Sequence, residues 1–419
     1  MDPFDDANGL CLRGANRHLQ GDLAGAMADF NKALELDPHC AEAYNNRGAT
    51  RRAQGDLAGA IADFDQAIQI NPQYAEAYNN RGIARHTQGD LSGALADFQE
   101  AIQANPTYWE GYNNRGIVRQ AQGDLPGALA DFDRAIECNP SYAQAYSNRG
   151  LARQARSEWA GALADFDQAL RLTPEQAAAP IYHNRGAARY AQGDAAGALA
   201  DFDRALQINP RHLATYSNRG SARHALGDLE GALADFDHVI RETPRQAAAL
   251  HYHNRGGVRL TKKDLDGAIA DYDQALEIDP RLYIAFISRA NARYHKRDMA
   301  GYMDYRRAFV INPDLAAREV VRIIAADIRR DVTAALTNCS KHLRINPTDI
   351  TALGRQAVIM LLLGRREEAQ QGFEQILQLR PDTKEHLDLV IDAAKQLLAK
   401  GLRESAKPQK GEEGTAYFV

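Results

Sequence analysis

Apolar and polar positions recur along this chain with a period of about 34 residues. One proline marks each period, and successive prolines lie 34, 34, 34, 34, 36, 34, 36, 33, 34 and 34 residues apart. A phrase of the form Ala-Tyr-Asn-Asn-Arg-Gly follows most of them, and Gly-Asp follows that phrase. Self-similarity at a fixed period indicates a repeat architecture. The sequence therefore predicts about eleven copies of one unit, not the three unrelated domains that 419 residues would suggest.

Each unit predicts a pair of helices. In the unit that starts at Ala41, the first half is rich in alanine and ends at Gly55-Asp56, a helix stop followed by a helix N-cap. The second half ends at Pro72, because the residue before a proline is pushed out of the helical region. Between these points the apolar residues have helical spacing: Leu57, Ile61, Phe64 and Ile68. No segment alternates with a period of two, so we predict no sheet.

The chain resembles tetratricopeptide-repeat proteins over about residues 7–383. Counted from Ala41, the signature positions are the fourth, eighth, twentieth, twenty-fourth, twenty-seventh and thirty-second: Tyr44, Gly48, Ala60, Phe64, Ala67 and Pro72. The resemblance implies an all-α fold, a right-handed superhelical solenoid of stacked antiparallel helix pairs (an α-α superhelix). The pattern departs from the family at the seventh and eleventh positions, where arginine replaces the usual leucine and tyrosine.

Irregularities in the repeat predict the organisation of the chain. We expect a leader at 1–6, eight regular units at 7–282 and three degenerate units at 283–383. Residues 384–403 form an amphipathic pattern that predicts a capping helix, because the last unit of a solenoid must cover an exposed core. Residues 404–419 then form a flexible tail. Two-residue insertions after Pro174 and Pro244 are expected to extend the turn or the first turn of the next helix.

The resemblance also implies which residues line a groove. Positions 2, 5, 6, 9, 12 and 13 of each first helix form the concave face, here termed the first-helix wall. A carboxamide has both a donor and an acceptor and can pair with an extended backbone. Helices pack roughly 8–10 Å apart and an extended chain covers about 3.3 Å per residue, so one asparagine would meet a peptide about every three residues. The sixth position is asparagine in seven successive units: Asn46, Asn80, Asn114, Asn148, Asn184, Asn218 and Asn254. The alternative is that these side chains bond to the neighbouring helix.

Neighbouring positions of the same wall would recognise the side chains of a bound peptide. We predict contacts from the fifth position (Asn45, Asn79, Asn113, His183 and His253) and from the twelfth (Arg52, His86, Tyr190 and His224). This wall is polar without strong charge. It lacks the lysine and arginine set with which chaperone-binding members of the family hold a C-terminal carboxylate, so a co-chaperone role is disfavoured.

The two arginine columns have a structural and a functional interpretation. The arginines stand four residues apart and share one helix stripe, as Arg47 and Arg51 do. Aspartates of the second helix, such as Asp63 and Asp65, favour arginine forks that bridge adjacent units through paired carboxylates. The alternative is a phosphate-binding ladder for RNA. The nearby aspartates and the net charge of −5 disfavour nucleic acid.

Composition narrows the class of protein. With 45% hydrophobic and 25% charged residues the chain is not disordered as a whole. No apolar run approaches the roughly 18 residues of a membrane span, and the acidic N-terminus does not have the pattern of a signal peptide. The four cysteines have neither metal-ligand spacing nor a disulfide pattern, which suits a reducing compartment. We expect a cytoplasmic protein of bacterial type without membrane contact.

No catalytic motif is present: the sequence contains no phosphate loop, nucleophile elbow or paired-cysteine metal motif. It therefore predicts a non-enzymatic adaptor or scaffold, without cofactor, that binds a partner protein or extended peptide in its groove; a small-molecule ligand is disfavoured. One alternative is a regulatory or inhibitory subunit that sequesters a bacterial enzyme, such as a protease, or a transcription factor. RNA binding is a minor alternative. The C-terminal sequence Thr415–Val419 suggests self-association by docking into a groove, against the simpler expectation of a free end.

Overall fold

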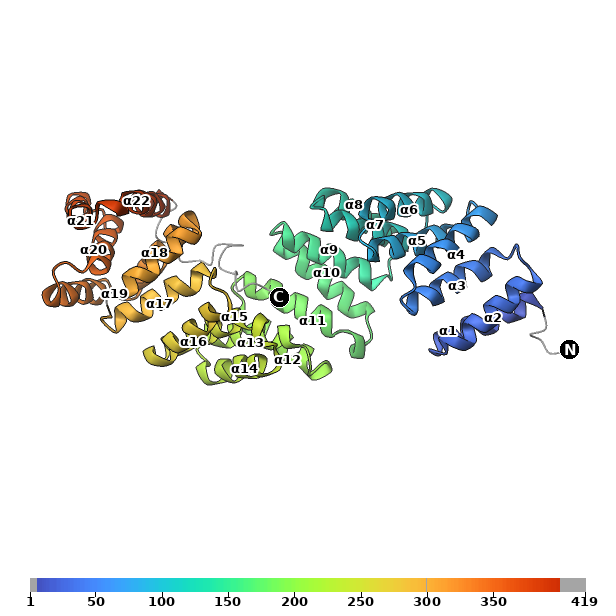
Figure 1. Ribbon diagram of the computed structural model, residues 1–419, viewed down its shortest axis with the longest axis horizontal. Coiled ribbons are helices and arrows are strands. Elements are labelled where there is room, and N and C mark those ends of the chain that lie inside the picture. The colour runs from blue at the N-terminus through green and yellow to red at the C-terminus, as the bar shows by residue number, and fades with distance from the viewer. Residues whose placement is uncertain (1–5, 299, 400–419) are drawn as a thin grey trace. The chain divides into compact units, whose positions relative to one another are not determined.

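Paired α-helices make up the described chain. The computed structural model describes residues 6–298 and 300–399, except for the side chains of 326–330. These residues contain no β-strand. Within each part of the chain, successive helices pack against each other, for example α3 against α4 and α4 against α5 (Figure 1). The predicted all-α fold of stacked antiparallel helix pairs is confirmed.

Contacts divide the chain into two compact units, residues 1–185 and 186–419, and the division falls inside α11. The first unit contains five complete helix pairs, the 3₁₀ turn η1 and the start of α11. Its helices are α1 (Ala7–Leu19), α2 (Leu23–Leu36), α3 (Ala41–Ala53), α4 (Leu57–Ile70), α5 (Ala75–Thr87), α6 (Leu91–Ala104), α7 (Trp109–Ala121), α8 (Leu125–Cys138), α9 (Ala143–Ala155), α10 (Trp159–Leu172), η1 (Glu175–Ala177) and α11 (Ala179–Ala191).

The second unit continues the same alternation and ends with an additional helix. Its helices are α12 (Ala195–Ile208), α13 (Leu213–Leu226), α14 (Leu229–Glu242), η2 (Arg245–Ala247), α15 (Ala249–Thr261), α16 (Leu265–Ile278), α17 (Tyr283–His295), α18 (Gly301–Ile311), α19 (Pro313–Ile345), α20 (Ile350–Leu362), α21 (Arg366–Leu379), η3 (Pro381–Thr383) and α22 (Lys384–Ala399).

Local signals fix the shape of each pair. Gly55 has a φ of +87°, a left-handed conformation that suits glycine and ends α3. The next residue, Asp56, accepts a hydrogen bond from the Gly59 amide at 2.9 Å and so caps α4. Within the pair, the ring of Phe64 is fully buried against Gly48. A Cβ at Gly48 would lie 2.7 Å from the ring, so a glycine is needed for the two helices to approach this closely.

The irregular regions follow the sequence predictions in part. Each two-residue insertion forms a 3₁₀ turn, η1 or η2, directly before the next first helix, which confirms that the insertions extend the turn. Helix α19 breaks at Asp331, where the backbone is extended and the carboxylate caps the following turn through the Ala334 amide at 2.9 Å. This break divides α19 into two helical segments.

The C-terminal region packs differently from the regular units. Bulky aliphatic residues of α17 to α22, including Ile287, Ile324 and Ile359, join one large buried cluster. The regular units instead bury small alanine and phenylalanine clusters, one to a pair. This change of core explains why the signature weakens in the sequence. The boundaries at 282/283 and 383/384 stay predictions, residues 400–403 of the predicted cap and the tail 404–419 lie outside the described residues, and so do residues 1–5 of the leader.

Candidate functional site

A buried aspartate joins the two arginine columns in each regular unit. Asp165 on α10 is 3% exposed. It accepts hydrogen bonds from Arg149 Nε at 3.0 Å and Nη2 at 2.6 Å, and from Arg153 Nη1 at 2.7 Å. Arg149 also donates through Nη1 to Asp133 of the preceding unit, at 2.7 Å. The predicted bridging of adjacent units by arginine forks is confirmed.

The same arrangement repeats in both compact units. Buried aspartates occupy the equivalent position in successive pairs: Asp29, Asp63, Asp97, Asp131, Asp201, Asp235, Asp271 and Asp304. Because most of the seventh-position guanidinium groups engage two carboxylates, the proposed phosphate ladder lacks the free cations it would require. Each guanidinium also lies 5.1–5.6 Å from the centroid of the aromatic ring three residues earlier, as Arg149 does over Tyr146.

The sixth-position asparagines form a hydrogen-bonded ladder in the first compact unit. Asn80 Nδ2 donates to Asn45 Oδ1 at 2.9 Å. Asn114 Nδ2 donates to Asn79 Oδ1 at 2.8 Å. One more step follows, from Asn148 Nδ2 to Asn113 Oδ1 at 2.8 Å. These three sixth-position carboxamides are thus each held by the fifth-position asparagine of the preceding pair.

The remaining sixth-position asparagines do not extend this ladder. The side chain of Asn46 accepts a long hydrogen bond from Asn45 Nδ2, at 3.5 Å. Asn184 is half-buried at the end of the first compact unit. In the second unit Asn218 is 6% exposed and its Nδ2 has no hydrogen-bond partner among the described residues. Asn254 Oδ1 lies 3.3 Å from His253 Nδ1.

The fifth-position residues correct the prediction that this position is exposed. Asn45, Asn79 and Asn113 are 1%, 4% and 2% exposed. Their side chains are therefore buried below the surface of the first-helix wall and cannot contact a partner. They act as acceptors for the ladder above them. The histidines at this position are half-buried: His183 lies on α11, and His253 Nε2 lies 3.1 Å from Ser288 Oγ. Burial lowers the pKa of His253.

The twelfth-position residues are half-buried and fall in both compact units. Arg52 and His86 belong to the first, and the Arg52 Nε is buried without a hydrogen-bond partner among the described residues. In the second unit, Tyr190 donates to the Ser221 carbonyl at 3.4 Å. His224 Nε2 lies 2.8 Å from Thr261 Oγ1, and burial lowers the pKa of His224. Their contact with a peptide stays a prediction.

A row of acidic and aromatic residues beside the ladder was missed at the level of sequence. The second position carries Glu42, Glu76 and Glu110, and the last position of each unit carries Tyr74 and Tyr108. Burial, with a contribution from Glu42, raises the pKa of Glu76. Burial and the charge of Glu110 raise the pKa of Tyr108. The 34-residue recurrence of these residue types was the signal that could have revealed the row.

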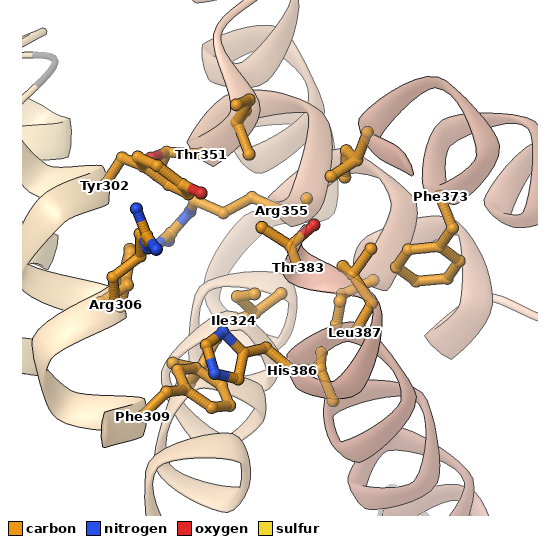
Figure 2. A pocket seen from close by; sticks show the side chains of 17 residues that line it. Tyr302, Arg306, Phe309, Ile324, Thr351, Arg355, Phe373, Thr383, His386 and Leu387 are labelled. Carbon is orange, nitrogen blue, oxygen red and sulfur yellow. The ribbon is translucent and has the colours of Figure 1, made fainter. Parts of the chain in front are cut away.

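A small apolar cavity lies in the second compact unit. It has a volume of about 100 Å³ and is lined from α18, α19, α20, α21 and α22. Figure 2 shows Tyr302 and Arg306 on one side, and Phe309 beside His386, whose ring centroid lies 4.7 Å away. Since an apolar cavity of about 150 Å³ binds benzene, this one accommodates at most a small apolar group. Five consecutive helices build it together, so no local motif indicates it.

The described residues contain neither a metal-binding cluster nor a membrane-spanning helix. Within residues 6–298 and 300–399, no group of three or more histidine, cysteine, aspartate or glutamate side chains is arranged to hold a metal ion. In the same part of the chain, no helix has the combined length and apolarity that crossing a bilayer requires.

Sequence profiles of repeat families match much of the chain. The profile described as TPR repeat matches residues 14–51, 50–89 and 118–157. Profiles described as tetratricopeptide repeat match residues 75–108, 179–212 and 252–282. The comparison with curated proteins finds no match.

Solved structures of similar repeats cover parts of the chain. A tetratricopeptide repeat protein from Parabacteroides merdae is 21% identical with a TM-score of 0.46, over 60% of this chain and 98% of its own. TTC0263 from Thermus thermophilus is 25% identical with a TM-score of 0.37, over 44% and 98%. YrrB, described as a TPR protein with an unusual peptide-binding site, is 24% identical with a TM-score of 0.36, over 44% and 95%.

Proposed function

This chain is a tetratricopeptide-repeat protein, and we propose that it is a non-enzymatic scaffold that binds an extended segment of a partner polypeptide along the first-helix wall of residues 41–155. In this region the first helices touch one another in succession, α3 with α5, α5 with α7 and α7 with α9. A segment that crosses them therefore meets equivalent positions at regular intervals.

The asparagine ladder is the observation that supports this proposal. An asparagine NH₂ group has two N–H bonds and its carbonyl oxygen has two lone pairs. The bond from Asn80 to Asn45 uses one N–H and fixes the direction of the carboxamide. Asn80 and Asn114 are half-buried at the surface of the wall, so their remaining polar groups are available to a peptide backbone. A donor that is already oriented loses less entropy on binding.

The row beside the ladder favours a basic partner segment. The carboxylates of Glu42 and Glu76 are reachable from solvent, although the residues that surround Glu76 desolvate it enough to raise its pKa, and the half-buried Tyr74 and Tyr108 present aromatic rings next to them. Carboxylates attract lysine and arginine, and tyrosine rings attract the same cations through their faces. We therefore expect basic side chains about every three residues along the bound segment, in step with the helices of the wall.

Selection of peptides on the full-length protein tests the proposal. A library of random peptides is displayed against the immobilised protein, and the affinity of selected peptides is measured by fluorescence anisotropy. Asn80→Ala and Asn114→Ala are each expected to weaken binding about three- to tenfold, the value of one hydrogen bond. The matched control is Gln66→Ala on the exposed face of α4, which should leave affinity unchanged.

The outcomes separate the two parts of the proposal. Binding that is equal in all three variants contradicts a role for the ladder. Selected peptides without enrichment in lysine and arginine contradict the charge preference alone. Circular dichroism at the assay temperature confirms that the variants are folded, because Asn80→Ala leaves the buried Asn45 oxygen without its donor.

A further inference from the structure

Two of the four cysteines face each other near the N-terminal end of the described chain. Cys11 lies on α1 and Cys40 is the N-cap residue of α3, 29 residues later. Their sulfur atoms are 3.9 Å apart. Cys11 is 3% exposed, whereas Cys40 is half-buried and reachable from solvent. The contact therefore joins a protected thiol and an accessible one across two helix pairs.

Comparison with the next repeats shows that Cys11 and Cys40 stand where two other residues contact each other. Cys11 and Cys40 occupy the fifth and last positions of the first repeat. In the next repeat the same two positions hold Asn45 and Tyr74, whose side chains lie against each other. The following repeats keep asparagine and tyrosine at these positions, with the same spacing of 29 residues: Asn79 with Tyr108 and Asn113 with Tyr142. Later repeats depart from this pair in other ways, as with His183 and His212, but the first repeat is the one that places cysteine at both positions.

We propose that Cys11 and Cys40 form a dithiol site that an oxidised low-molecular-weight thiol converts into an intramolecular disulfide. The Cys40 thiolate attacks the disulfide of the oxidant, which forms a mixed disulfide on Cys40 and releases one thiolate. The Cys11 thiol then loses its proton and its sulfur attacks Cys40 Sγ, which breaks the mixed disulfide and releases the second thiolate. The two protons of the cysteines end on the two released thiols, so two cysteines are oxidised and one disulfide reagent is reduced.

The environment of the pair sets this order of events. Burial, with a smaller contribution from Cys40, raises the pKa of Cys11 to about 12, so Cys11 is a poor first nucleophile. Cys40 is the thiol that a reagent can reach. A disulfide needs the sulfur atoms about 2.05 Å apart, which requires an approach of roughly 2 Å from the reduced separation.

The disulfide would fasten the first helix pair to the second. In a linear array each pair is stabilised mainly by its neighbours, so a covalent bond from one pair to the next raises the free energy of opening that pair locally. A bond from α1 to the start of α3 closes a loop that contains all of α2. Oxidation should therefore protect α1 and α2 from local opening and leave distant pairs unchanged.

Peptide mapping of the oxidised full-length protein tests the assignment. The protein is incubated with oxidised glutathione at about pH 8, alkylated after unfolding, digested and examined by mass spectrometry. We expect a Cys11–Cys40 cross-link, with Cys339 recovered alkylated because it is 1% exposed. In Cys11→Ser the second step is blocked, so Cys40 should keep the glutathione adduct. In Cys40→Ser, Cys11 should be recovered alkylated, without a glutathione adduct, and Cys138→Ser should form the cross-link as the unaltered protein does.

Hydrogen exchange supplies a second readout on the same samples. Amide exchange in α1 and α2 should slow at least tenfold on oxidation, and Cys11→Ser should show no such change. A stable glutathione adduct on Cys40 in the unaltered protein would overturn the proposal, because Cys11 would then have failed to displace it. Recovery of both cysteines as alkylated thiols would overturn it as well.

Discussion

Removal of the buried carboxylate at Asp131 should open its helix pair, whereas removal of Asp133 from the same helix should not. Asp131 is 2% exposed and accepts hydrogen bonds from Arg115 Nε at 3.0 Å, Arg115 Nη2 at 2.5 Å and Arg119 Nη1 at 2.8 Å. The Asp133 side chain is 51% exposed and accepts one bond, from Arg149 at 2.7 Å. The two aspartates stand on α8, two residues apart.

The magnitudes follow from what each substitution leaves behind. Loss of one member of a buried ion pair costs about 3–5 kcal/mol, because its partner stays buried without compensation. Arg115 and Arg119 keep 13% and 32% exposure of their side chains, so water relieves part of the cost and we expect about 3 kcal/mol for Asp131→Ala. Asp133→Ala breaks an exposed pair, and such pairs contribute about 0–1 kcal/mol.

Hydrogen exchange measures this difference locally, which matters because a long array need not unfold in one step. At 1.36 kcal/mol per factor of ten, 3 kcal/mol should accelerate exchange in α7 and α8 roughly 100-fold or more. The control, Asp133→Ala, should accelerate it no more than about fivefold. Asp131→Leu combined with Arg115→Met and Arg119→Met should recover most of the loss, because an apolar trio of similar volume leaves no uncompensated charge. Equal acceleration in the two single variants would refute the reasoning.

Three further substitutions address the backbone, the close contact between helices and the charge of the core. Lys263 has a φ of +66°, at a position where most other units have a glycine. Lys263→Gly should therefore stabilise the protein by about 1 kcal/mol and raise its melting temperature. The control Lys262→Gly, at a helical φ of −70°, should lower the melting temperature. A Cβ on Gly256 would lie 2.7 Å from the ring of Tyr272, whereas a Cβ on Gly257 would have nothing within 4 Å. In urea unfolding, Gly256→Ala should therefore lower the free energy of unfolding by about 1–3 kcal/mol, and Gly257→Ala should raise it slightly. Hydrogen bonds from arginine lower the pKa of Asp29. The stability that Asp29 contributes is therefore fully present above its unfolded pKa of 3.8 and is lost as the pH falls through the lower folded pKa. Hydrogen exchange in α1 measured during an acid titration should show this loss, and Asp29→Asn should reduce the pH dependence.

The helix pairs were predictable because most of the regular units carry the same local signals. Gly55 ends one helix and Asp56 caps the next, and each acts through its own backbone or its nearest neighbours. Such signals need no knowledge of the rest of the fold. The arginine bridges were predictable for a related reason, since positions four apart on one helix must share a stripe and the carboxylates recur in phase with them.

The depth of each position could not be predicted in the same way. Asn45 and Asn80 are both asparagines at positions that recur with the repeat, yet Asn45 is 1% exposed and Asn80 lies half-buried above it. A polar side chain is read as exposed because its burial without a partner is costly. Here the partner is another asparagine 35 residues away, so burial of Asn45 depends on how closely two helix pairs pack. The cavity beside Phe309 escapes prediction for the same reason, as it depends on five helices at once.

The ladder makes a structural role of the asparagines compatible with the binding role that we propose for them. A carboxamide that only held adjacent pairs together could be replaced by any pair of matched groups, and one that only bound peptide would be free to rotate before binding. Asn114 donates to Asn79 and accepts from Asn113 at 3.3 Å, so its plane is set by two neighbours before a partner arrives. Any gain in affinity from this orientation depends on the packing of the helices, because the packing holds the carboxamide in place. Substitutions that loosen the stack without touching the wall should therefore weaken binding as well.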